Sequence, residues 1–189
     1  MFQDMQWLNE PPTWGLDGDR LVAAPGAETD FWRETFYGFV HDNGHLYYRD
    51  VAGDFTAEVT LVGRYENTYD QSGLMLRVDE RHWVKAGLEL ADGVVLMSTV
   101  LTREHSDWSV LALADYAGTL SVRLTRHGDA IRVEFRVPGG NWQLQRLGYL
   151  PLPETCLVGL MCCSPVRAGF EARFEDFAVT EPISRDLHA

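Results

Sequence analysis

Residues 83–101 read WVKAGLELADGVVLMSTVL, and this stretch decides the fold. Side chains alternate between two faces on both sides of Asp92-Gly93, a dipeptide that favours a two-residue type I′ turn between antiparallel strands. Such a turn fixes which residues face each other across the two strands. The stretch therefore predicts a β-hairpin whose core face pairs Leu90 with Val95, Leu88 with Met97, Ala86 with Thr99 and Val84 with Leu101.

The opposite face of this hairpin mixes aromatic, charged and small side chains. It includes Lys85, the only lysine among the 16 cationic residues of the chain. A solvated sheet surface accounts for such a face, and so does a groove whose donors and acceptors bind a hydroxyl-rich ligand or a small anion. Gly73 and Gly87 would let that ligand lie close to the backbone. By parity the face comprises Trp83, Lys85, Gly87 and Glu89, flanked by Leu96, Ser98 and Val100 on one side and by Gln71, Gly73, Met75 and Arg77 on the other.

The same alternation extends over most of the chain. It recurs between residues 54 and 179, interrupted by Gly, Asp and Asn turns, while helical periodicity is nearly absent. This pattern is typical of an antiparallel sandwich or barrel. A length of 189 residues favours one domain. We therefore predict a single all-β domain over residues 1–180, followed by a frayed tail over residues 181–189.

Composition restricts the classes of partner. Lys and Arg number 16 against 28 Asp and Glu, a net charge of −12 that disfavours binding to nucleic acid or to an anionic membrane. No targeting segment or long apolar run is evident, so we expect a cytoplasmic protein. Three cysteines in one apolar stretch predict buried reduced thiols: Cys156, Cys162 and Cys163.

Motifs for metal binding and catalysis are weak. The segment His41-Asp42-Asn43-Gly44-His45 has two histidines at a spacing that metal ligation allows, but Asn43-Gly44 favours a hairpin turn. Glu171 and Glu175 would lie about 13 Å apart on one strand, too far for a glycosidase pair. There is no nucleophile elbow, zinc motif or phosphate-binding loop. The sequence predicts no metal and no cofactor.

Five arginines form a locally basic patch in this acidic chain. Alternation places Arg123, Arg132 and Arg136 on outward faces. A solvated sheet surface explains them, and an acidic partner protein is the functional alternative. The patch comprises Arg123, Arg126, Arg132, Arg136 and Arg146.

Several motifs, taken in order, resemble a bacterial and fungal family of unknown function that is labelled regulation-of-enolase-like. They cover nearly the whole chain, at residues 7–12, 29–32, 69–77, 83–89, 106–109, 163–165 and 174–177. The resemblance implies a concanavalin A-like jelly-roll sandwich of two antiparallel sheets, the fold of legume lectins and many glucanases. It also implies a ligand groove on the concave sheet, where we place Asp70, Gln71, Arg77, Trp83, Lys85, Glu89, Ser106, Asp107 and Trp108.

The leading functional prediction is the binding of a carbohydrate or other small polar ligand. Lys85 and Glu89 would orient the ligand, and Trp83 would stack on it. One alternative is a regulatory module that binds a protein partner. Another is a glycan-active enzyme with Glu89 or Asp107 as general acid or base, although the chain lacks the closely spaced acidic motif of glucanases with this fold. The sequence therefore favours binding over catalysis.

Overall fold

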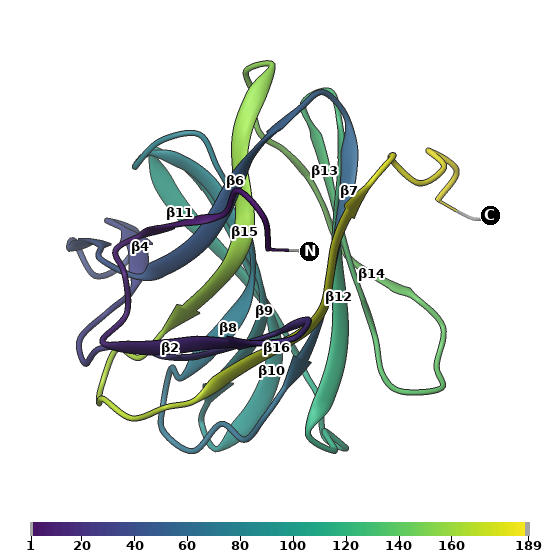
Figure 1. Cartoon of the computed structure of the whole chain (residues 1–189). Helices are drawn as coiled ribbons and strands as arrows, with labels where there is room; N and C mark the ends of the chain where they lie inside the picture. Colours follow the sequence, from purple (N-terminus) through teal and green to yellow (C-terminus); the bar gives the residue numbers. More distant parts are fainter. Residues whose placement is uncertain (1, 188–189) are drawn as a thin grey trace.

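The chain forms a sandwich of two seven-stranded antiparallel sheets (Figure 1), as a computed structural model describes it over residues 2–187. Sheet A has the order β1 (Gln6–Leu8), β6 (His45–Ala52), β15 (Thr155–Cys163), β8 (Gln71–Arg77), β9 (His82–Ala91), β10 (Val94–Arg103) and β11 (His105–Ala112). Sheet B has the order β14 (Gln143–Tyr149), β13 (Ala130–Arg136), β12 (Thr119–His127), β7 (Phe55–Val62), β16 (Ala172–Thr180), β3 (Arg20–Ala24) and β2 (Thr13–Asp17). A short hairpin joins β4 (Phe31–Arg33) to β5 (Val40–Asp42). The predicted all-β class is confirmed.

The predicted central hairpin is present with the predicted register. β9 and β10 pair Leu88 with Met97 and Val84 with Leu101. Asp92 and Gly93 have φ values of 52° and 75°, the left-handed conformation that a type I′ turn requires. The predicted core face is buried between the two sheets except at Val95, which is partly buried, because β7, β12 and β13 of sheet B present their own alternate apolar residues to it.

A second, smaller apolar core lies on the outer face of sheet A. There the β4–β5 hairpin covers the sheet on the side away from sheet B (Figure 1). Phe31 of β4 is completely buried and packs on Trp83, with ring centroids 6.1 Å apart. The hairpin is thereby fixed over the polar face of β8 and β9. This second core comprises Phe31, Leu46, Met75, Trp83, Val100, Met161 and Cys163.

The prediction that Asn43-Gly44 forms a hairpin turn is wrong. β5 pairs with β4, whereas β6 pairs with β1 and β15, so the segment is a crossing between two sheets. The Asn43 side chain accepts a hydrogen bond from the backbone N–H of Asp30 and donates one to the carbonyl of Glu28. A Cβ atom on Gly44 would lie 2.4 Å from the Phe31 ring and 2.6 Å from Cys163 Sγ. Close packing, not turn geometry, accounts for this glycine.

All five arginines of the predicted patch have partners within the chain. Arg123 and Arg132 both donate to Glu134 at 2.7 Å, and the guanidinium groups of Arg123 and Arg136 lie 4.3 and 4.5 Å from the centroid of the Trp142 ring. Arg136 also pairs with Glu58, Arg146 pairs with Asp107, and Arg126 donates to the backbone carbonyls of Gly128 and Glu154. The patch therefore offers little free positive charge to an acidic partner.

The segment after β16 is held against sheet B over its described part. The backbone N–H of Ile183 donates to Thr56, and Arg132 donates to the carbonyl of Ser184. These bonds join residues 183 and 184 of the predicted tail to the sheet, and residues 188 and 189 lie outside the described part of the chain.

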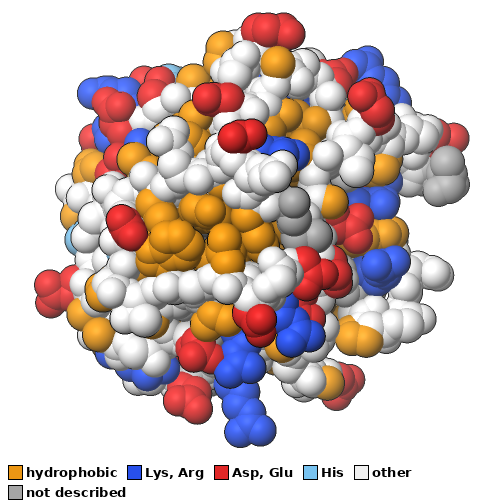
Figure 2. Space-filling view, in the orientation of Figure 1, with side chains coloured by type: hydrophobic (Ala, Val, Ile, Leu, Met, Phe, Trp, Pro, Cys, Tyr) orange, Lys and Arg blue, Asp and Glu red, His pale blue; other side chains and the backbone are white. Residues whose placement is uncertain are grey.

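Aromatic side chains close the sandwich edge beside the N-terminal segment. Trp7, Trp14 and Tyr47 have ring centroids 4.8–5.6 Å apart, and Figure 2 shows apolar surface between β1 and β2, where these rings gather. All three cysteines are buried free thiols, as predicted. Within residues 2–187, no helix is long and apolar enough to cross a membrane.

Candidate functional site

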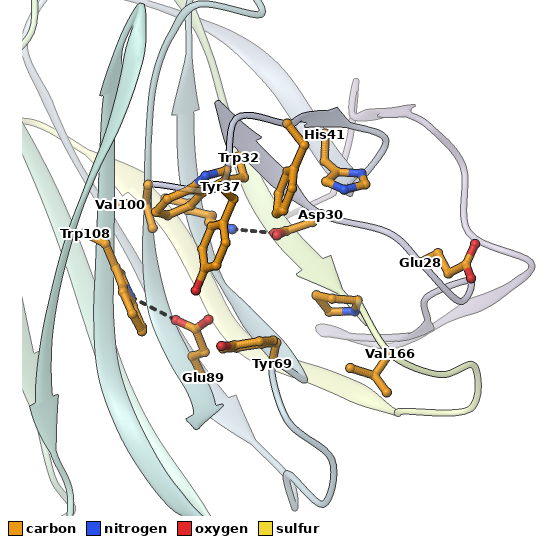
Figure 3. Close-up of a pocket in the computed structure, with 13 residues that line it drawn as sticks. Glu28, Asp30, Trp32, Tyr37, His41, Tyr69, Glu89, Val100, Trp108 and Val166 are labelled. Carbon is orange, nitrogen blue, oxygen red and sulfur yellow. Dashed lines mark hydrogen bonds and ion pairs between the residues drawn. The ribbon is translucent and has the colours of Figure 1, made fainter. Parts of the chain in front are cut away.

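A cavity of about 440 Å³ lies on the outer face of sheet A, at the edge of the second apolar core. The β4–β5 hairpin, the segment before β4 and the loop before β8 surround it, and β9, β10 and β11 form its floor and one wall (Figure 3). Its lining residues are Glu28, Asp30, Trp32, Tyr37, Phe39, His41, Tyr69, Lys85, Glu89, Val100, Trp108, Pro165 and Val166.

Aromatic rings form much of the cavity wall. Trp108 of β11 is 40% exposed, which leaves its ring accessible from the cavity. Trp32, Tyr37 and Phe39 come from the β4–β5 hairpin, where the last two rings stack with centroids 5.2 Å apart. Tyr69 lies across the cavity in the loop before β8 (Figure 3). Burial and a hydrogen bond with Tyr37 raise the pKa of the Tyr69 phenol.

The floor of the cavity holds a buried ion pair. Lys85 Nζ lies 2.8 Å from Asp30 Oδ1 and 2.7 Å from Gln71 Oε1, while Gln71 donates to the carbonyl of Tyr69. Burial by itself would lower the pKa of Lys85, but the charge of Asp30, helped by Cys163 and Glu89, raises the pKa above its ordinary value. Lys85 is therefore a protonated structural cation, not a nucleophile.

Glu89 has a different environment on the same strand. Ser98 Oγ donates to its Oε2 at 2.6 Å, and Trp108 Nε1 donates to the same oxygen at 3.2 Å and to Ser98 Oγ at 2.9 Å. Burial raises the pKa of the Glu89 carboxyl, against the opposing effects of Lys85 and these hydrogen bonds. This network orients the carboxyl group and the Trp108 ring together toward the cavity (Figure 3).

The prediction that Trp83 stacks on a ligand required an exposed ring, and the ring is not exposed. It is completely buried in the second apolar core, because the β4–β5 hairpin covers its end of β9. Strand parity gives the face of a residue but not what covers that face. Trp108, which was also among the predicted site residues, is the more exposed of the two tryptophans that line the cavity.

The remaining predicted residues brace the walls instead of lining the cavity. Arg77 donates to both carboxylate oxygens of Asp42 at 2.6 and 2.8 Å and so ties β8 to β5. Asp70 is 1% exposed and accepts from Ser164 and Arg167. Ser106 Oγ accepts a hydrogen bond from the backbone N–H of Arg33. Asp107 lies on the opposite face of β11 from Trp108 and pairs with Arg146.

Gly73 and Gly87 were predicted to make room for a ligand, but in the structure they make room for backbone atoms. Gly73 and Gly87 face each other across β8 and β9. A Cβ atom on Gly73 would lie 2.2 Å from the carbonyl oxygen of Ala86, and one on Gly87 would lie 2.1 Å from that of Ser72. Neither residue is among those that line the cavity. The glycines therefore allow close approach of the two strands.

The two histidines of the 41–45 segment are separated. His41 lines the cavity, whereas His45 is buried, contacts the carbonyl of Asn9 and accepts the backbone N–H of Gly26. Within residues 2–187, no group of three or more His, Cys, Asp or Glu side chains is arranged to hold a metal ion.

Sequence reasoning missed the β4–β5 hairpin as part of the site. Residues 31–39 read FWRETFYGF, in which five of nine residues are aromatic, against 12% aromatic residues in the whole chain. That local excess is the signal that could have identified the hairpin. Its short strands were not recognised by alternation, because each has only three residues.

Comparison with known proteins agrees with this fold. A family described as "Protein of unknown function (DUF1349)" matches residues 7–182. "Regulation of enolase protein 1" of Saccharomyces cerevisiae is 38% identical over 182 residues, which cover 96% of this chain and 92% of that protein. A crystal structure of a functionally unknown protein from the same species has a TM-score of 0.92 and 37% identity, over 97% of this chain and 99% of that one.

A solved carbohydrate-binding module also has this fold. CBM66 from Bacillus subtilis has a TM-score of 0.59 and 14% identity, over 95% of this chain and 98% of that one. At this identity the likeness concerns the fold alone. It supports the concanavalin A-like class of the predicted sandwich.

Proposed function

This chain belongs to the DUF1349 family of proteins of unknown function, and we propose that it binds a small hydroxyl-rich ligand of the carbohydrate class in the sheet A cavity. One observation carries the proposal: accessible aromatic rings surround a floor of oriented polar groups. Sugars present apolar C–H faces and hydroxyl rims, so they match a site that combines ring stacking with a few fixed donors and acceptors. A volume of about 440 Å³ is within the usual range for small-molecule sites.

The site supports binding better than hydrolysis. A glycosidase needs two carboxyl groups that flank the scissile bond. In the cavity, Asp30 is held by Lys85, and Glu89 by Ser98 and Trp108. Asp107, the other candidate acid or base, lies on the opposite face of β11 with Arg146. The likeness to a carbohydrate-binding module supports the same proposal at the level of the fold.

Trp108→Ala should weaken binding of a neutral sugar about tenfold or more, because it removes an accessible indole ring of the wall and a donor to Glu89. Isothermal titration of the wild type and the variant with glucose, xylose and their disaccharides measures the change. Trp142→Ala is the matched control, since Trp142 contacts Arg123 and Arg136 of sheet B and does not line the cavity. If a sugar binds to Trp108→Ala and to the wild type with equal affinity, its binding site lies outside this cavity.

A second candidate function is binding of a protein partner, which the name of the yeast relative suggests for that protein. The tip of the β4–β5 hairpin favours it here, because Phe36 is 94% exposed and Tyr37 is 53% exposed. Sedimentation of this protein with the enolase of its own source organism discriminates the two functions. A complex that sediments faster than either protein alone, and that Phe36→Ser abolishes, would support binding of a protein partner. Sedimentation of the mixture as two separate proteins would count against it.

A further inference from the structure

We propose that the ligand of the sheet A cavity carries a protonated amino group that sits against Glu89, so that the site prefers aminated to neutral carbohydrates. This inference rests on the proposed function and names the class of ligand more closely. It follows from the balance of charge in the cavity, from the free oxygen of Glu89 and from the rings around that oxygen.

Negative groups outnumber positive ones in the cavity. Three carboxylates line it, at Glu28, Asp30 and Glu89, against the single ammonium group of Lys85. Lys85 is already occupied, since its Nζ contacts Asp30 Oδ1 at 2.8 Å and Gln71 Oε1 at 2.7 Å. The whole chain has a net charge of −12, which attracts cations and repels anions at long range. An anionic ligand is therefore disfavoured and a cationic one favoured.

Glu89 provides the specific contact for the cation. Its side chain is more than nine-tenths buried, with 7% of the residue exposed. Both hydrogen bonds that the protein gives to this carboxyl group go to Oε2, from Ser98 and Trp108. Among the described residues, none donates to Oε1. This second oxygen belongs to a side chain that lines the cavity, so a ligand there can supply the donor that the protein does not.

The surroundings of this oxygen suit a cation. Trp108 stands beside Glu89, and the hydroxyl ends of Tyr37 and Tyr69 point toward the Glu89 side of the cavity (Figure 3). Phenol oxygens can accept hydrogen bonds from an ammonium group, and nearby aromatic rings attract such a group more strongly when water is excluded. An ammonium group could thus pair with Oε1 while the sugar ring stacks on the wall.

The titration of Glu89 should make the binding of an amine depend on pH. The other charged and titratable groups of the cavity are Lys85 on its own strand, Glu28 and Asp30 before β4, Tyr37 and His41 in the hairpin and Tyr69 before β8. Burial raises its pKa, and a bound cation would lower it again. Amine binding therefore favours the ionised form of Glu89. The affinity for an amine should rise as the pH rises through the raised pKa of Glu89, whereas the affinity for a neutral sugar should not.

The test is isothermal titration of the full chain with glucosamine, N-acetylglucosamine and glucose near pH 7. The two amino sugars differ by an acetyl group that removes the charge. We expect glucosamine to bind about tenfold more tightly than N-acetylglucosamine. Glu89→Gln should reduce that preference to about twofold or less while glucose binding persists, because the amide oxygen of the substituted side chain can still accept from Ser98 and Trp108.

Asp107→Asn is the matched control, since it removes the same charge from β11 on the face that pairs with Arg146 of sheet B, away from the cavity, and should leave the preference unchanged. Equal affinities for glucosamine and glucose in the wild type would overturn this inference and leave the proposed function standing. A preference that survives Glu89→Gln would also overturn it. Absence of heat with all three sugars at about 10 mM would overturn both proposals.

Discussion

Lys85→Met should lower the free energy of unfolding by about 3 kcal/mol, because it leaves Asp30 as a largely buried carboxylate without its cation. Breaking a buried pair typically costs about 3–5 kcal/mol, and the lower end applies because the Asp30 side chain keeps 19% exposure. Urea denaturation of the two proteins measures the difference, which corresponds to a melting temperature lower by about 10 °C.

The double variant Lys85→Met with Asp30→Asn is the control for this prediction. It removes both charges, so it should be less destabilised than the sum of the two single variants predicts. A Lys85→Met protein within about 1 kcal/mol of wild type would mean that the pair is screened by solvent and that the cavity floor is not the buried network described above.

Gly87→Ala should lower the free energy of unfolding by about 3 kcal/mol or more. A Cβ atom at this position would lie 2.1 Å from the carbonyl oxygen of Ser72 and 2.5 Å from the Cα of Gly73. Both obstacles are backbone atoms of β8, so relief requires the two strands to separate under the cavity. Loss of the cooperative transition in thermal or urea unfolding would be the extreme form of this result.

Gly15→Ala is the matched control for that substitution. Gly15 also lies in a strand, β2, but no atom lies within 4 Å of the position of its Cβ, and its φ is not positive. Alanine there should be neutral or stabilising by up to about 1 kcal/mol, because it restricts the unfolded chain. Equal stability of Gly87→Ala and wild type would show that β8 and β9 can separate at little cost.

The centre of sheet A was predictable because its determinants are local. Asp92-Gly93 fixes the turn, and alternation then fixes the register, since a slip of one residue would place Lys85 and Glu89 in the core. Asn43-Gly44 has the same turn preference, yet the chain crosses between sheets there. Contacts with Asp30, Glu28 and Phe31 override the local preference, and those contacts arise only in the folded chain.

The candidate site was predicted in part. Lys85, Glu89 and Trp108 line the cavity, and Gln71 contacts Lys85. The exposure of Trp83 depends on a hairpin whose position no strand pattern reveals. The prediction that Asp107 and Trp108 share one site conflicts with strand geometry, because adjacent residues of a strand point to opposite faces.

The central claim is that the sheet A cavity binds the ligand, and the six tryptophan indole groups allow the most direct test. We would record their ¹H–¹⁵N spectrum while adding glucosamine or glucose, with Trp108→Phe to assign the Trp108 signal. The account predicts saturable shifts of the Trp108 and Trp32 indole signals, while those of Trp7, Trp14 and Trp142 stay in place. Saturable shifts confined to Trp14 or Trp142, or no shift of any indole signal, would contradict it.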